Sequence, residues 1–204
     1  MDTLVIHPTS TAQWHALVNE AESMCHARLG EELESYLVFL LMRYLNAADI
    51  ANSVLALEYL QTAEMTGKLR TEQLRDVGDK CLLYSGLFPG RAQRRRVSIS
   101  YYVDLGIAAY QLLASSFADM RAQMYQTIST RFVALMDVLQ ATREVHNLQS
   151  SLQPLEAMEL WNDTNSPHAR ATLALYSNGF PVKTVQPTIE PALYARTKHT
   201  PYAH

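Results

Sequence analysis

Long hydrophobic runs are absent from this sequence of 204 residues, and their absence argues against a membrane-spanning protein. The longest strongly apolar run covers residues 37–42 and ends at Arg43, far short of the roughly 20 residues that cross a bilayer. Residues 1–10 contain Asp2 and lack both the basic start and the apolar core of a signal peptide. We therefore expect no membrane span and a cytoplasmic location.

Cysteine is scarce, and neither sign of charge dominates. The two cysteines, Cys25 and Cys81, are far apart in apolar segments, whereas disulfide scaffolds are short and cysteine-dense, so we expect buried free thiols. Seventeen Lys and Arg against twenty Asp and Glu give a net charge of −3, which provides no global field for nucleic acid or anionic lipid. We do not expect a nucleic-acid partner from the overall charge, and any such binding would have to come from a local basic patch.

The eight prolines are unevenly placed along the chain. Residues 9–88 and residues 90–153 contain none, and Pro89 separates these two segments. Long proline-free segments rich in Ala, Leu, Met, Gln and Glu favour helix. The sequence predicts an all-α fold, a multi-helix bundle of about six main helices in one domain over residues 1–180, with short connections and antiparallel neighbours. The expected helices cover residues 11–29, 31–47, 50–66 (ended by Gly67), 71–88, one that starts at Ser100, 118–149 (kinked or split), and two short helices, 155–161 and 168–176.

The helix over residues 31–47 is expected to be the central one. It opens with acidic residues, which suit the positive end of the helix dipole, and continues as an apolar run that covers all its sides. We expect its large side chains to be buried, namely Tyr36, Leu37, Phe39, Leu40 and Leu41. Residues 181–204 contain four prolines and no apolar period, so they are predicted to form an extended or disordered, Pro-rich C-terminal tail.

Recognisable catalytic and metal-binding motifs are missing. A ferritin-like di-iron site needs Glu-x-x-His units, and the sequence contains none. There is also no P-loop, no dinucleotide-binding glycine pattern and no Gly-x-Ser-x-Gly elbow. One helix face carries His15, Asn19, Glu22 and His26 opposite its apolar side, and we interpret it as a solvated polar stripe. The sequence assigns no catalytic residue, no metal site and no cofactor.

The strongest local anomaly is a basic connection with four arginines within six residues, Arg91, Arg94, Arg95 and Arg96. A helix start at Ser100 follows, where backbone N–H groups and the helix dipole favour an anion. These residues are a candidate anion-binding site for a phosphate-bearing ligand, an RNA backbone or an acidic protein partner. The alternative is a solvated loop whose arginines pair with carboxylates of this chain, such as Asp76, Asp79 and Asp104.

Charged residues in the helix over 71–88 indicate a surface face. Asp76 and Lys80 are spaced as an i,i+4 ion pair, and Asp79 lies between them. Arg43 follows the most apolar run, so its guanidinium either finds an acidic partner or reaches solvent from the helix end.

Three segments, 76–79 (DVGD), 85–89 (SGLFP) and 101–110 (YYVDLGIAAY), resemble a pattern in an uncharacterised bacterial all-helical protein family. The resemblance implies a bacterial cytoplasmic setting and brings no activity, substrate or ligand set. Because the predicted core positions gather no polar groups, the leading hypothesis is a helical interaction or structural module that self-associates, as a homodimer or another homo-oligomer. The alternative is a ferritin-like or other helical-bundle enzyme that depends on a metal or cofactor.

Overall fold

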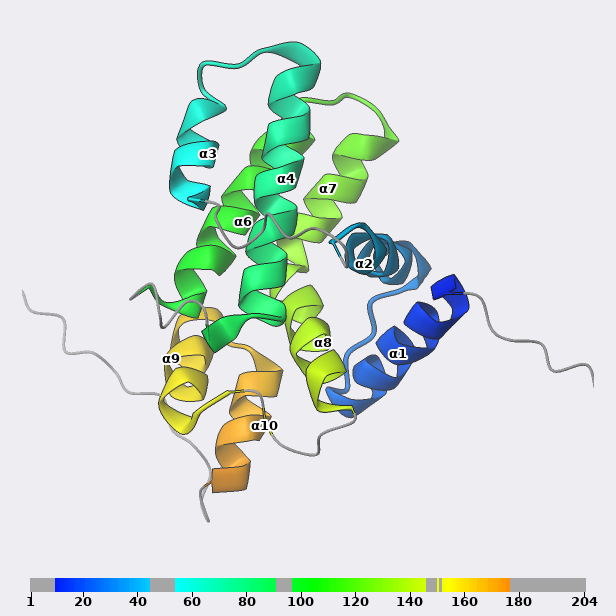
Figure 1. Cartoon of the computed structure of the whole chain (residues 1–204), viewed down its shortest axis with the longest axis vertical. Coiled ribbons are helices and arrows are strands. Elements are labelled where there is room, and N and C mark those ends of the chain that lie inside the picture. The colour runs from blue at the N-terminus through cyan, green and yellow to red at the C-terminus, as the bar shows by residue number, and fades with distance from the viewer. Residues whose placement is uncertain (1–9, 45–53, 91–96, 146–149, 151, 177–204) are drawn as a thin grey trace, which may run out of the picture.

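The computed structural model describes residues 10–44, 54–90, 97–145, 150 and 152–176. These residues form α-helices and no β-strand, which confirms the all-α prediction (Figure 1). None of the helices is both long and apolar enough to cross a membrane. In chain order they are α1 (Ser10–Met24), α2 (Glu31–Tyr44), α3 (Leu55–Gln61), α4 (Gly67–Gly86), α6 (Ile99–Ser115), α7 (Met120–Thr130), α8 (Phe132–Glu144), α9 (Pro154–Thr164) and α10 (Pro167–Tyr176).

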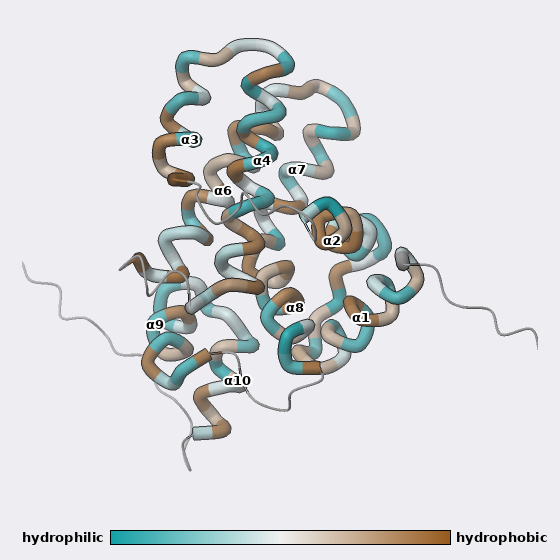
Figure 2. Tube along the Cα trace, in the orientation of Figure 1, coloured by the Kyte–Doolittle hydropathy of each residue, from teal (hydrophilic) through white to brown (hydrophobic). Residues whose placement is uncertain are grey.

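Helices α4 and α6 form the centre of the fold and pack along each other. Helices α3 and α8 pack on α4, α7 and α9 pack on α6, and α1 packs on both α2 and α8 (Figure 1). Hydrophobic and hydrophilic residues are mixed along the helices, so each helix buries a stripe rather than its whole surface (Figure 2). The three largest fully buried side chains are Tyr84 of α4, Tyr110 of α6 and Phe132 of α8.

Gly78 allows α4 to approach α6 closely, and Gly106 allows α6 to approach α8 closely. A Cβ atom on Gly78 would lie 2.8 Å from the ring of Tyr110, and one on Gly106 would lie 2.5 Å from the ring of Phe132. Any larger residue at either position would push the helices apart, and such overpacking is destabilising. The glycines of the DVGD and YYVDLGIAAY segments therefore have a packing role.

Helix α2 is not enclosed on all sides, so the expectation for Phe39 is wrong. Leu37, Leu40 and Leu41 are buried as predicted and Tyr36 is half-buried, but the Phe39 side chain is 63% exposed. The reason is that α2 lies at the side of the bundle, where neighbours cover only part of its surface (Figure 1). A uniformly apolar segment does not reveal which of its sides its neighbours leave open.

Several predicted helix ends move. Gly67 begins α4 instead of ending the preceding helix, and its φ of 59° is in the left-handed region that favours glycine. Ser98, not Ser100, caps α6, because its Oγ accepts a hydrogen bond from the N–H of Tyr101 at 3.2 Å. The predicted helix over 118–149 is split at Arg131, which separates α7 from α8.

The polar stripe on α1 is only partly solvated, which corrects a further expectation. The Glu22 carboxylate is buried and accepts a hydrogen bond from the N–H of Leu29 at 2.5 Å. It therefore holds the chain that follows α1 rather than facing solvent. Both cysteines are free thiols as expected, with Cys81 buried and Cys25 half-buried. The predicted tail, residues 181–204, lies outside the described residues.

Candidate functional site

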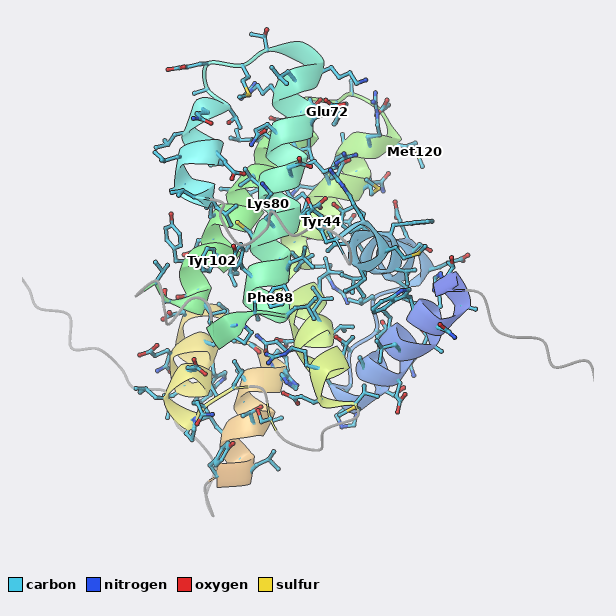
Figure 3. All side chains as sticks on the ribbon, viewed as in Figure 1. Tyr44, Glu72, Lys80, Phe88, Tyr102 and Met120 are labelled. Atoms are coloured by element: carbon cyan, nitrogen blue, oxygen red, sulfur yellow. The ribbon has the colours of Figure 1, made fainter. Side chains whose placement is uncertain are left out.

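A cleft between the start of α4, the end of α6 and the start of α7 gathers positive charge. It consists of two adjoining hollows of about 560 and 230 Å³ that share several lining residues. Figure 3 labels Glu72 on α4 and Met120, the first residue of α7. We call it the basic cleft, and its principal lining side chains are Lys68, Arg70, Thr71, Glu72, Arg75, Ser115, Ser116, Phe117, Arg121 and Tyr125.

The α-helical period places the cations of α4 along this cleft. Lys68, Thr71 and Arg75 are spaced by three and four residues, so they share one helix face. From the other side comes Arg121, in the first turn of α7. Asp119 caps α7 by accepting from the N–H of Arg121 at 3.0 Å, and it also pairs with the Arg121 guanidinium at 2.8 Å. The same guanidinium lies 4.1 Å from the centre of the Phe117 ring.

Carboxylates neutralise this cluster only in part. Of the four cationic side chains that line the cleft, Arg121 pairs with Asp119 at 2.8 Å and Lys68 pairs with the exposed Glu72 at 3.6 Å, while Arg70 and Arg75 form no ion pair among the described residues. Exposed pairs of this kind contribute about 0–1 kcal/mol. The Nε atoms of Arg70 and Arg75 are buried and have no hydrogen-bond partner among the described residues. A buried donor without a partner costs about 1–3 kcal/mol, so the positions of these two Nε atoms are unfavourable.

The start of α4 adds to the positive field. Thr66 precedes the helix in an extended conformation, and its side chain makes no capping hydrogen bond. The first N–H groups of this helix of 20 residues therefore lack a side-chain cap, at the end where the helix dipole is positive. The hydroxyls of Thr71, Ser115 and Ser116 instead donate to backbone carbonyls of their own helices. A bound anion would thus be held by guanidinium, ammonium and backbone N–H donors.

A buried hydrogen-bond network lies next to the cleft. Asp79 is 3% exposed, and its Oδ1 accepts from the hydroxyls of Tyr36 at 2.5 Å and Tyr110 at 2.7 Å. Its Oδ2 accepts from the guanidinium of Arg43 at 3.2 Å. Burial raises the pKa of Asp79, while these donors lower it. The network ties α2 to both α4 and α6.

The Tyr110 ring connects this network to the cleft, since it stacks on Tyr125 with 6.2 Å between the ring centres. Burial also raises the pKa of Tyr125, although the positive charge of Arg75 lowers it. The Tyr125 phenol therefore stays protonated at neutral pH. It can form part of the cleft floor but cannot act there as an anionic base.

The expected surface face on α4 is wrong in two respects. Asp79 is buried in the network, and Lys80 does not pair with Asp76. Instead, Lys80 pairs with Glu58 of α3 at 2.8 Å, and Asp76 pairs with Arg43 at 2.6 Å. Arg43 thus finds acidic partners, one of the two alternatives that the sequence left open.

The anion site predicted from sequence falls largely outside the structure. Arg91, Arg94, Arg95 and Arg96 are not among the described residues. Ser100 is described, and its buried Oγ donates to the Oγ of Ser98 at 2.9 Å. A cavity of about 40 Å³ beside it is also lined by Glu156 and Glu159, so carboxylates of this chain already face the start of α6. Anion binding by the basic connection stays a prediction.

Sequence reasoning did not find the basic cleft. The face formed by Lys68, Thr71 and Arg75 could be read from helical spacing, but Arg121 joins it only through the packing of α7 on α6. In the part of the chain that the structure describes, no three His, Cys, Asp or Glu side chains are placed to hold a metal ion.

No family model matches the sequence, and searches of curated proteins and of solved structures found no match.

Proposed function

We propose that this protein is a helical binding module that holds a phosphate-bearing ligand in the basic cleft. The observation that carries the proposal is the convergence of Lys68, Arg70, Arg75 and Arg121 around a helix start without a side-chain cap. A phosphate group offers several acceptor oxygens and about two negative charges, which match guanidinium forks, an ammonium and backbone N–H groups together.

The cleft is suited to binding rather than to reaction. Its hydroxyls already donate to backbone carbonyls, and burial keeps the Tyr125 phenol protonated. Glu72 is exposed and lies beside Lys68, with which it pairs at 3.6 Å. These groups can neutralise and orient a phosphate, and none of them is arranged to attack it.

Titration calorimetry with inorganic pyrophosphate at low ionic strength tests this function. The wild type should bind, and its affinity should fall as salt rises because the interaction is between charges. Arg70→Gln and Arg121→Gln should each weaken binding by about ten-fold or more, since a hydrogen bond to a charged group contributes about 1.5–3 kcal/mol. Arg170→Gln is the matched control, because Arg170 is exposed on α10 and does not line the cleft.

The same titration separates the basic cleft from the connection that contains Arg94, Arg95 and Arg96. Changing these three residues together to Gln should leave pyrophosphate binding intact if the cleft is the site. Loss of binding in that triple variant, with normal binding by Arg70→Gln and Arg121→Gln, would contradict the proposal and place the site at 91–96. A wild type that binds no pyrophosphate at low salt would also refute it.

Self-association of the module remains part of this proposal, and a stripe on α3 supports it. Val54, Leu57 and Leu60 are spaced three residues apart and are all more than half exposed. Sedimentation velocity will show whether the chain is a homodimer. The alternative, a ferritin-like or other metal- or cofactor-dependent enzyme, gains no comparable support, because the described residues bring no set of metal ligands together. The domain over 1–180 and the cytoplasmic location remain predictions.

A further inference from the structure

A second hollow, separate from the basic cleft, lies where three chain junctions meet. Its lining residues come from the end of α1 (24–28), the junction of α7 and α8 (130–137) and the turn between α9 and α10 (164–171). We call it the junction groove. Its volume of about 700 Å³ falls within the range of roughly 300–1,000 Å³ found for small-molecule sites.

The walls of the groove contain an unusual backbone feature. Two residues other than glycine have a positive φ in the described part of the chain, His26 at 52° and Asn165 at 59°. Both line the junction groove. Such conformations persist only where the surrounding structure holds them, so the two turns that form these walls are well defined.

The groove has an apolar floor and a cationic rim. Val133, Ala134 and Ala171 supply apolar surface, while Arg28 and Arg131 supply positive charge. The guanidinium of Arg131 donates to the backbone carbonyl of Arg28 at 2.6 Å, which holds the Arg131 head group against the chain segment that carries Arg28. Val133 and Ala134 also belong to the first turn of α8, which has no side-chain cap. The end of α7 and the start of α8 meet at this point, so opposite ends of two helix dipoles adjoin and the positive charge of the groove comes from the two arginine side chains.

The one carboxylate in the lining is already engaged. Asp137 is buried, and its Oδ1 accepts from the hydroxyl of Ser166 at 2.6 Å. Its Oδ2 accepts from the N–H of His168 at 3.3 Å, so this carboxylate caps the start of α10. The structure shows no ion pair between Asp137 and Arg28 or Arg131 among the described residues. The two arginines can therefore receive an external anion.

We propose that the junction groove binds a small carboxylic acid with an apolar body. The carboxylate lies between Arg28 and Arg131, and the apolar body lies along Val133, Ala134 and Ala171. This site is independent of the basic cleft, because the two share no lining residue. A ligand of this kind matches the floor and the rim together, whereas a bare anion would leave the apolar floor exposed to water.

The native chain contains a reporter for this site. Cys25 is half-buried and lines the groove, whereas Cys81 is fully buried. An alkylating reagent added to the folded protein should therefore modify Cys25 selectively. Burial raises the pKa of Cys25 to about 11, so the reaction will be slow at neutral pH and is best followed at mildly alkaline pH.

The experiment compares the rate of Cys25 alkylation in the presence of decanoate below its micelle-forming concentration, decanol below its solubility limit, or acetate. Decanoate should slow alkylation in a saturable way, by about ten-fold at a concentration about ten times its Kd. Decanol lacks the charge and acetate lacks the apolar body, so each should protect at least about ten-fold more weakly.

Two variants test the position of the carboxylate. Arg28→Gln keeps the backbone carbonyl that Arg131 contacts, and it should weaken protection by decanoate about ten-fold without changing protection by decanol. Arg131→Gln should also weaken protection by decanoate about ten-fold, and circular dichroism should show that this variant keeps the helix content of the wild type. The Arg170→Gln control should behave as wild type. Equal protection by decanoate and decanol, no protection by decanoate, or full protection in both groove variants would each overturn the proposal.

Discussion

Removal of the Asp79 carboxylate is the most informative perturbation of the fold. Asp79→Ala deletes the common acceptor of Tyr36, Tyr110 and Arg43. The matched control is Asp76→Ala, since Asp76 is on the same helix and pairs with the same Arg43, but its side chain is 33% exposed. The two variants differ mainly in burial and in the two tyrosine hydroxyls that only Asp79 holds.

The expected magnitudes follow from these contacts. Asp79→Ala leaves two buried hydroxyls without their acceptor, and each such loss costs about 1–3 kcal/mol. The hydroxyls of Tyr36 and Tyr110 are 3.1 Å apart, so one can still donate to the other. Removing a carboxylate whose burial raises its pKa also relieves part of its desolvation. We therefore expect a loss of about 2–4 kcal/mol, against less than about 1 kcal/mol for Asp76→Ala.

Urea unfolding at pH ~7, followed by far-UV circular dichroism, measures both values by linear extrapolation. A double-mutant cycle adds a sharper criterion. Tyr110→Phe should cost about 1–2 kcal/mol in the wild type and much less in the Asp79→Ala background, because the hydroxyl has then lost its acceptor. Equal losses for Asp79→Ala and Asp76→Ala, or an unchanged effect of Tyr110→Phe in both backgrounds, would refute the reasoning.

Two further predictions concern other parts of the molecule. Burial raises the pKa of Asp137 to about 6, above the value of about 3.9 in unfolded chains. The folded protein therefore holds the carboxyl proton more tightly than the unfolded chain does. The stabilisation that this proton provides is full below about pH 4 and is lost as the pH rises through about 6. Asp137→Asn should therefore gain up to about 3 kcal/mol relative to wild type between about pH 4 and pH 7, and urea unfolding curves separated by the same amount at every pH would contradict this. Phe39→Ala should cost less than about 1 kcal/mol because Phe39 is exposed, whereas Phe132→Ala should cost about 3–5 kcal/mol, and similar losses in thermal unfolding of the two variants would show that Phe39 is covered in solution.

The candidate site was only partly accessible to sequence reasoning. A local excess of arginine at 91–96 drew attention to an anion site there, because composition is visible along the chain. The basic cleft has no such local excess, since Lys68 is in the first turn of α4, Arg75 lies about two turns further on, and Arg121 belongs to another helix. Likewise, the spacing of Asp76 and Lys80 suggested an ion pair, but each residue pairs with a different helix. Spacing gives the face of a helix and not the partner that covers it.

The helical class and most of the helix positions follow from the amino-acid sequence alone. Those follow from local physics: proline interrupts helices, and apolar side chains at helical spacing favour one buried stripe. Three features follow only from the packing of the helices. Phe39 is exposed, Asp79 is buried where it accepts from two tyrosine hydroxyls, and Lys68 and Arg121 line the same cleft. Each of these depends on which helices approach each other. The packing of two helices depends on the sizes of the side chains on both of them, as the close contacts at Gly78 and Gly106 show. The residues that meet in such a contact are far apart in the sequence, so local patterns do not reveal them.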